Sequence, residues 1–108
     1  MVEAEKTSEE RRPEEHPLPP ATFSFLVFSL RTQAEVSLGL LASGEEKKQP
    51  SVDLRSARHT IDLLAMLQEK TRGNLSLEEQ RFLDNSLTEL RFRYVQAVED
   101  SRKQKQPE

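Results

Sequence analysis

The sequence predicts a small all-α protein of three helices, in which the second and third helices form an antiparallel hairpin and both ends of the chain are disordered. Two observations support this fold. Apolar residues recur at helical spacing in three separate stretches, and polar segments with Gly or Pro divide these stretches. With 108 residues, of which 34% are apolar and 32% are charged, the chain has room for one small domain at most.

The two ends of the chain differ from the middle in composition. Residues 1–20 carry six acidic and three basic side chains together with several prolines, so they have almost nothing to bury. Residues 101–108 carry three basic side chains, one acidic side chain and no apolar one. We therefore expect a disordered leader over 1–20, a single helical domain over 21–100 and a disordered tail over 101–108.

The first predicted helix spans residues 22–42, where apolar side chains recur on one face. Gly44 is placed to close its end. A strand remains an alternative, because Thr22–Val27 and Val36–Leu40 show some two-residue alternation. The predicted core face consists of Phe23, Leu26, Val27, Leu30, Ala34, Leu38 and Leu41.

A polar linker over residues 43–53 leads to the second predicted helix, residues 54–72. Asp53 is a favourable N-cap, and Gly73 is suited to the left-handed conformation that follows many helices. Basic side chains in the last turn favour the negative end of the helix dipole. The predicted core face consists of Leu54, Ala57, Ile61, Leu64, Ala65 and Gln68.

The third predicted helix spans residues 77–100. It is preceded by a capping box in which Ser76 caps the helix and Glu79 reaches back. The connection from the second helix, Gly73–Leu75, is so short that the two helices must run antiparallel. The predicted core face consists of Leu83, Leu87, Leu90, Tyr94, Ala97 and Val98.

Each helix also carries apolar side chains away from its predicted core face. A helix that is apolar on two sides needs two partners, and a large exposed patch usually marks an interface. We therefore expect a homo-oligomer, with a dimer favoured, and we leave open an unidentified protein partner. The alternative is a monomer whose wide faces are fully wrapped. The predicted partner-binding residues are Phe25, Phe28, Val36, Leu63, Met66, Phe82, Asn85 and Phe92.

The sequence contains little that indicates catalysis. Asn85 and Glu89 lie among aromatic residues, and His59 lies on the preceding helix, so a small-molecule binder or minor enzyme built on these three residues is the alternative function. The chain has no Cys and two His, which excludes a Cys-rich zinc site. We expect no enzyme activity, no cofactor and no metal.

Charge and hydropathy argue against nucleic-acid and membrane partners. The formal net charge is −3, whereas a nucleic-acid binder usually carries a basic stripe. The apolar run Ala21–Leu30 ends at Arg31, well short of the about 20 residues of a transmembrane helix. The acidic, Pro-rich start does not have the pattern of a secretory signal. These observations predict a cytoplasmic protein.

Three stretches of the chain resemble a bacterial family, domain of unknown function 1844. They are Leu18–Leu30 followed by Thr32-Gln33-Ala34, then Thr60–Leu75, and finally Glu79–Tyr94. The resemblance covers about residues 18–98 and implies a short, helical, cytoplasmic bacterial protein. The family carries no established activity or catalytic residues, so it implies no site. We expect the linker over 43–53 to vary within the family.

Overall fold

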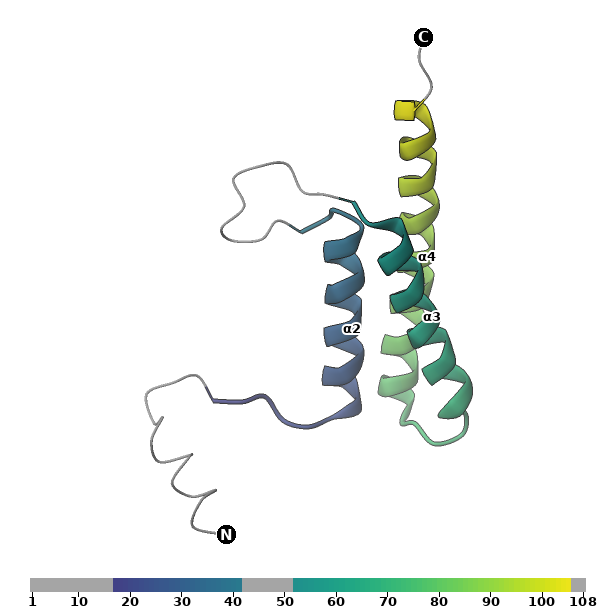
Figure 1. Cartoon of the computed structure of the whole chain (residues 1–108). Coiled ribbons are helices and arrows are strands. Elements are labelled where there is room, and N and C mark those ends of the chain that lie inside the picture. The colour runs from purple at the N-terminus through teal and green to yellow at the C-terminus, as the bar shows by residue number, and fades with distance from the viewer. Residues whose placement is uncertain (1–16, 42–51, 106–108) are drawn as a thin grey trace.

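The computed structural model describes residues 17–41 and 52–105, and within them the fold is three helices without a strand. These are α2 (Phe23–Ser37), α3 (Leu54–Lys70) and α4 (Leu77–Lys105). The prediction of an all-α, three-helix protein is confirmed. Figure 1 shows that α3 runs opposite to both α2 and α4, and that a short loop joins α3 to α4.

The helix α2 ends earlier than the sequence pattern predicts. Its N-terminus is capped by Thr22, whose Oγ1 accepts a hydrogen bond from the Phe25 N–H at 3.0 Å. At the C-terminus, Gly39 has φ of 78° and donates to the Val36 carbonyl at 3.0 Å, while Leu40 donates to the Glu35 carbonyl at 2.9 Å. This is the Schellman arrangement, so Gly39, not Gly44, closes the helix. Gly44 and most of the predicted linker lie outside the described residues.

The caps predicted for α3 and α4 are both present. Asp53 accepts a hydrogen bond from the Ser56 N–H at 3.1 Å and another from the Ser56 hydroxyl at 2.8 Å. The Ser76 N–H donates to Glu79 Oε1 at 2.9 Å, and the Glu79 N–H donates to Ser76 Oγ at 3.1 Å, which completes the capping box. Gly73, between the two helices, has φ of 81°. These contacts confirm the predicted helix starts.

The helix α4 is longer than predicted and continues through residues 101–105, which we expected to belong to a disordered tail. Residues 106–108 and 1–16 lie outside the described part of the chain. With 29 residues against 17 in α3, α4 is longer than its neighbour by about 18 Å at 1.5 Å per residue. Its C-terminal part extends past the ends of α2 and α3 (Figure 1).

The core lies where the three helices meet. Three buried apolar side chains come from α3 and three from α4, whereas α2 contributes two, together with Leu38 directly after its end. Most predicted core positions are buried or packed against the core, but Leu26 and Leu41 are exposed. Leu41 follows the end of α2, so it does not share the helical face. The buried apolar residues are Val27, Ala34, Leu38, Ala57, Ile61, Leu64, Leu83, Leu87 and Leu90.

Candidate functional site

Most of the predicted partner-binding side chains are exposed in the single chain. Phe28 is 52% exposed, Val36 is 48% exposed and Phe92 is 59% exposed. Phe25 and Met66 also belong to the exposed large apolar residues, and Asn85 is exposed. The surplus apolar side chains that the sequence pattern indicates therefore reach the surface on α2, α3 and α4.

Two of the predicted partner-binding residues are not exposed. Leu63 and Phe82 are half-buried, and Phe82 packs against the core. Phe82 lies one turn before Ser86, which accepts a hydrogen bond from Arg31 of α2, so Phe82 lies toward the side of α4 that faces α2. The expectation that Phe82 points outward is wrong, because this side of α4 is a helix contact instead of the back of the helix.

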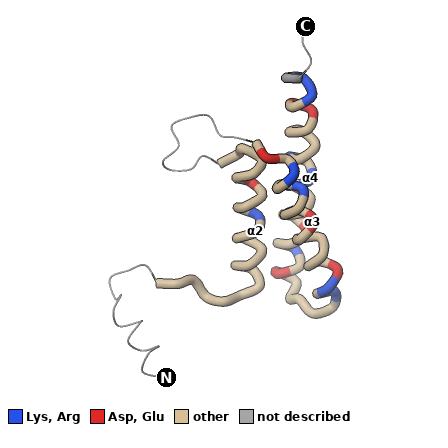
Figure 2. The backbone as a smooth tube through the Cα atoms, viewed as in Figure 1, with Lys and Arg blue, Asp and Glu red and all other residues tan. Residues whose placement is uncertain are grey.

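The outer face of α2 is free of charge. The only charged residues of this helix are Arg31 and Glu35, and both appear in Figure 2 against an otherwise uncharged tube. Arg31 Nε donates to Glu35 Oε2 at 3.1 Å. The same guanidinium reaches α4, where Nη1 donates to Ser86 Oγ at 3.3 Å and Nη2 lies 3.7 Å from Glu89 Oε1. Both charged side chains of α2 therefore form their contacts on the flank of the helix that faces α4.

A single row of uncharged side chains runs along the opposite side of α2 from its core residues. Phe25, Ser29, Thr32 and Val36 are spaced by four, three and four positions, so they lie above one another on the helix. Phe25 and Val36 are exposed, whereas Ser29 and Thr32 are half-buried. We call these four residues the outer row.

The outer row is flanked by further apolar surface. The ring centroids of Phe25 and Phe28 lie 6.1 Å apart at an interplanar angle of 37°, so these two aromatic side chains form one patch. Leu26 and Leu40 are also exposed large apolar residues on or just after this helix. The sequence pattern assigned Leu26 to the predicted core face, which is wrong, and it did not include Leu40 among the predicted partner-binding residues.

The exposed apolar residues of α4 have different surroundings. Phe92 stands between Arg91 and Arg93, and Arg93 Nη2 lies 3.4 Å from Glu89 Oε2. Val95, which was not predicted, is exposed one turn further on. Side chains of both charges therefore border the apolar surface of α4, in contrast to the outer row of α2.

Two buried polar residues were missed by the sequence pattern. Ser86 is 0% exposed and accepts the hydrogen bond from Arg31, and Thr60 is buried with its Oγ1 donating to the Ser56 carbonyl at 3.0 Å. The signal for Ser86 is its position three residues after Leu83 and four before Leu90, where a core residue is expected. A small hydroxyl there lets the Arg31 guanidinium approach α4.

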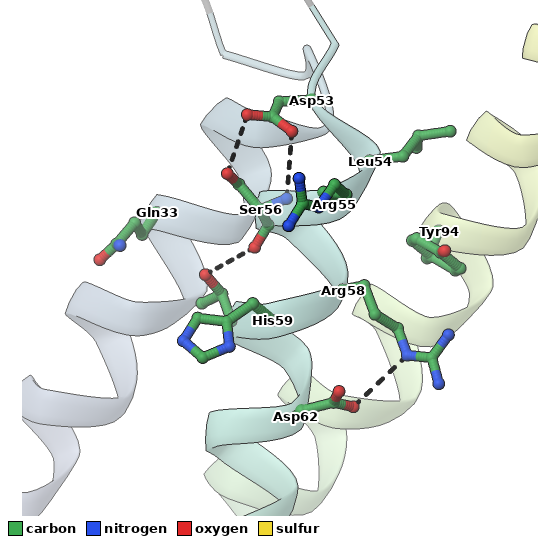
Figure 3. A pocket seen from close by; sticks show the side chains of 10 residues that line it. Gln33, Asp53, Leu54, Arg55, Ser56, Arg58, His59, Asp62 and Tyr94 are labelled. Carbon is green, nitrogen blue, oxygen red and sulfur yellow. Dashed lines mark hydrogen bonds and ion pairs between the residues drawn. The ribbon is translucent and has the colours of Figure 1, made fainter.

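The residues of the alternative site do not share one hollow. His59 lies in an open hollow around the start of α3, which is lined from Gln33 of α2 on one side to Tyr94 of α4 on the other (Figure 3). Neither Asn85 nor Glu89 lines it. Glu89 is instead paired with Arg31 and Arg93. The structure does not bring His59, Asn85 and Glu89 together there.

Local contacts in this hollow account for its electrostatics. The hydrogen bonds from the Ser56 N–H and hydroxyl lower the pKa of Asp53 below its ordinary value. The Tyr94 side chain and the Asp62 carboxylate raise the pKa of Arg58 above its ordinary value. Arg58 Nε lies 3.6 Å from Asp62 Oδ1, and both side chains are exposed. Within the hollow, these groups therefore form one exposed ion pair and a helix cap.

Neither a metal-binding cluster nor a membrane span is found where the structure is defined. Over residues 17–41 and 52–105, no three His, Asp or Glu side chains gather as metal ligands. Among the described helices, none combines the length and the hydropathy needed to cross a bilayer.

Comparison with known protein families gives a match over most of the chain. The sequence profile of the family described as domain of unknown function (DUF1844) matches residues 20–96, which is most of the chain and includes α2, α3 and most of α4. No curated protein and no solved structure matches the chain.

Proposed function

This chain belongs to the domain of unknown function 1844 (DUF1844) family, and we propose that it is a self-associating protein-interaction module whose outer row on α2 binds a second copy of the chain. The proposal assigns binding, without catalysis, to this surface. The cytoplasmic location expected from the sequence is part of the same proposal.

The observation that carries the proposal is the uncharged, partly apolar outer row of α2. Phe25, Phe28 and Val36 are exposed on a helix whose two charged side chains are both engaged on the α4 flank. Exposed apolar surface is unfavourable in water, and its burial contributes about 25 cal/mol per Å². A contiguous patch without charge is typical of an interaction surface.

The surface chemistry of the chain favours a second copy as the occupant. A partner that covers the outer row must itself present an uncharged face, since an unpaired charge is costly to bury there. The outward sides of α3 and α4 carry exposed ion pairs, such as Arg58 with Asp62 and Arg102 with Glu99. Among the described helices, α2 itself offers the matching face.

The arrangement of the polar residues supports binding over catalysis. A catalytic site needs an acid, base or nucleophile placed within reach of another functional group in a concave site. Asn85 and Glu89 lie apart from the hollow that contains His59. The carboxylate of Glu89 is already engaged by two guanidinium groups.

Sedimentation equilibrium of the whole chain over a wide concentration range tests the proposal. We expect a monomer–dimer equilibrium for the unaltered chain. Phe28→Asp places a charge beside the outer row and should raise the dissociation constant by at least about tenfold, which corresponds to about 1.4 kcal/mol.

The matched control is Phe92→Asp, which alters an equally exposed aromatic residue on α4. This variant should leave the dissociation constant within about threefold, which corresponds to less than 1 kcal/mol. Circular dichroism of both variants checks that the helices are intact. A chain that remains monomeric throughout the concentration range, or a dimer that only Phe92→Asp weakens, would contradict the proposal.

A further inference from the structure

The outer row has a distinct order of side-chain sizes. The large Phe25 stands near the start of α2, the small Ser29 and Thr32 stand in the middle, and the medium-sized Val36 stands near the end. The spacing of four, three and four residues is that of the two apolar positions of a coiled-coil heptad. The row therefore has the geometry of a helix–helix seam, and its two ends are not alike.

We propose that two copies pack α2 against α2 in an antiparallel manner, with the twofold axis passing between Ser29 and Thr32. Phe25 then lies opposite Val36 of the partner subunit, and Ser29 lies opposite Thr32 of the partner subunit. This inference rests on the proposed function and specifies the partner surface and its register.

Side-chain size favours the antiparallel direction. In a parallel pair, Phe25 meets Phe25 of the partner subunit and Val36 meets Val36 of the partner subunit, so one end is crowded and the other leaves a gap. Both overpacking and cavities destabilise a contact. In the antiparallel pair each end combines a large with a smaller side chain, which keeps the distance between the two helix axes even.

The middle of the row suits a close helix crossing. Small side chains let two helix backbones approach closely, as in other tightly packed helix pairs. Ser29 Oγ already donates to the Phe25 carbonyl at 3.0 Å, so its hydrogen is satisfied within α2. Its lone pairs remain free to accept a hydrogen bond from the Thr32 hydroxyl of the partner subunit. Neither hydroxyl is then buried without a partner.

The electrostatics of α2 agree with this arrangement. Arg31 and Glu35 lie on the α4 flank, where they pair with each other and Arg31 also contacts α4. Packing along the outer row therefore leaves both ion-pair contacts intact. The dipoles of two antiparallel helices also oppose each other, which is more favourable than the parallel arrangement.

Disulfide cross-linking tests the register, and the chain has no cysteine of its own. Phe25→Cys and Val36→Cys are purified separately, one of them with a mass tag, and are mixed and oxidised mildly. In the proposed dimer the mixed disulfide should exceed the share that random pairing gives. Two copies of residue 25 would lie about 16 Å apart along the axis, which is too far for a disulfide.

A second pair guards against loss of the interface on replacement of Phe25. Ser29→Cys and Thr32→Cys change little volume, and the mixed disulfide should again dominate. Dimers that cross-link Phe25→Cys to itself would overturn the antiparallel register but leave the self-association proposal intact. A monomeric chain without cross-links, or one that binds lipid vesicles instead through the outer row, would overturn both.

Discussion

The outward sides of α2 and of the α3–α4 hairpin differ, although their inward sides are alike. All three helices bury aliphatic side chains in one core. On the outside, α3 and α4 carry exposed ion pairs between side chains one turn apart. The charges of α2 are confined to its α4 flank, and its outer row is uncharged. The comparison teaches that the core fixes the fold of the subunit, whereas the outer surface of α2 is available for a second contact.

The largest expected effect is on the free energy of unfolding, and it distinguishes a buried from an exposed position on α4. Leu87→Ala removes a side chain that is 1% exposed and should lower the free energy of unfolding by about 2–5 kcal/mol, since it leaves a cavity among the helices. Urea denaturation followed by circular dichroism measures it. Phe92→Ala, on the exposed side of the same helix, should change the free energy by only about 0.5 kcal/mol.

Both measurements are best made in the Phe28→Asp background, because association adds its own stabilisation to the folded state. Equal losses for Leu87→Ala and Phe92→Ala in that background would contradict the division between an inner and an outer face of α4.

A smaller effect is expected where α2 meets α4. Arg31→Ala removes the donor to the buried Ser86 and the partner of Glu35 and Glu89. A buried polar group without its partner costs about 1–3 kcal/mol, so the free energy of unfolding should fall by that amount. Thermal and urea unfolding measure the change.

The double variant Arg31→Ala with Ser86→Ala should recover part of this loss, since no buried hydroxyl is then left without its donor. Arg72→Ala breaks an exposed pair with Glu69 and should not alter the unfolding midpoint. If Arg31→Ala is as silent as Arg72→Ala, the α2–α4 contact does not depend on this guanidinium.

The smallest effect concerns the N-cap of α3. The pKa of Asp53 is lowered from its ordinary value of 3.8 by hydrogen bonds from Ser56. The stabilisation is therefore present above pH 3.8 and is lost as the pH falls through the lower folded value. Asp53→Asn keeps the side-chain acceptor but does not titrate. Its melting temperature should fall less on acidification than that of the unaltered chain, and equal falls would contradict the role of the carboxylate.

Much of the fold is predictable from local chemistry. The caps at Asp53 and Ser76 follow from short-range hydrogen bonds whose donors lie within one turn, so the residue types alone predict them. The burial of the leucines of α4 is predictable from their helical spacing. The residue at which α2 ends was not predictable, because both Gly39 and Gly44 are suitable for a helix end and the apolar pattern continues past Gly39.

The outer face of α2 was predictable only in part. Phe28, Phe25 and Val36 are exposed as expected, but Leu26 was assigned to the core and is 44% exposed. A helix with apolar side chains all round does not reveal from spacing alone which of two adjacent positions its neighbours cover. The burial of Phe82 and Ser86 depends on where α2 packs against α4. This contact joins residues that are far apart in the sequence, since Arg31 and Ser86, which share a hydrogen bond, are 55 positions apart.

The overhang of α4 gives the subunit a direction. It lies at the end of the bundle where α2 finishes, because α2 and α4 run the same way (Figure 1). An antiparallel pair of α2 helices would place one such overhang at each end of the dimer, so the two overhangs would point away from each other. Labels attached to residue 102 in each copy would then report a long separation between the two overhangs.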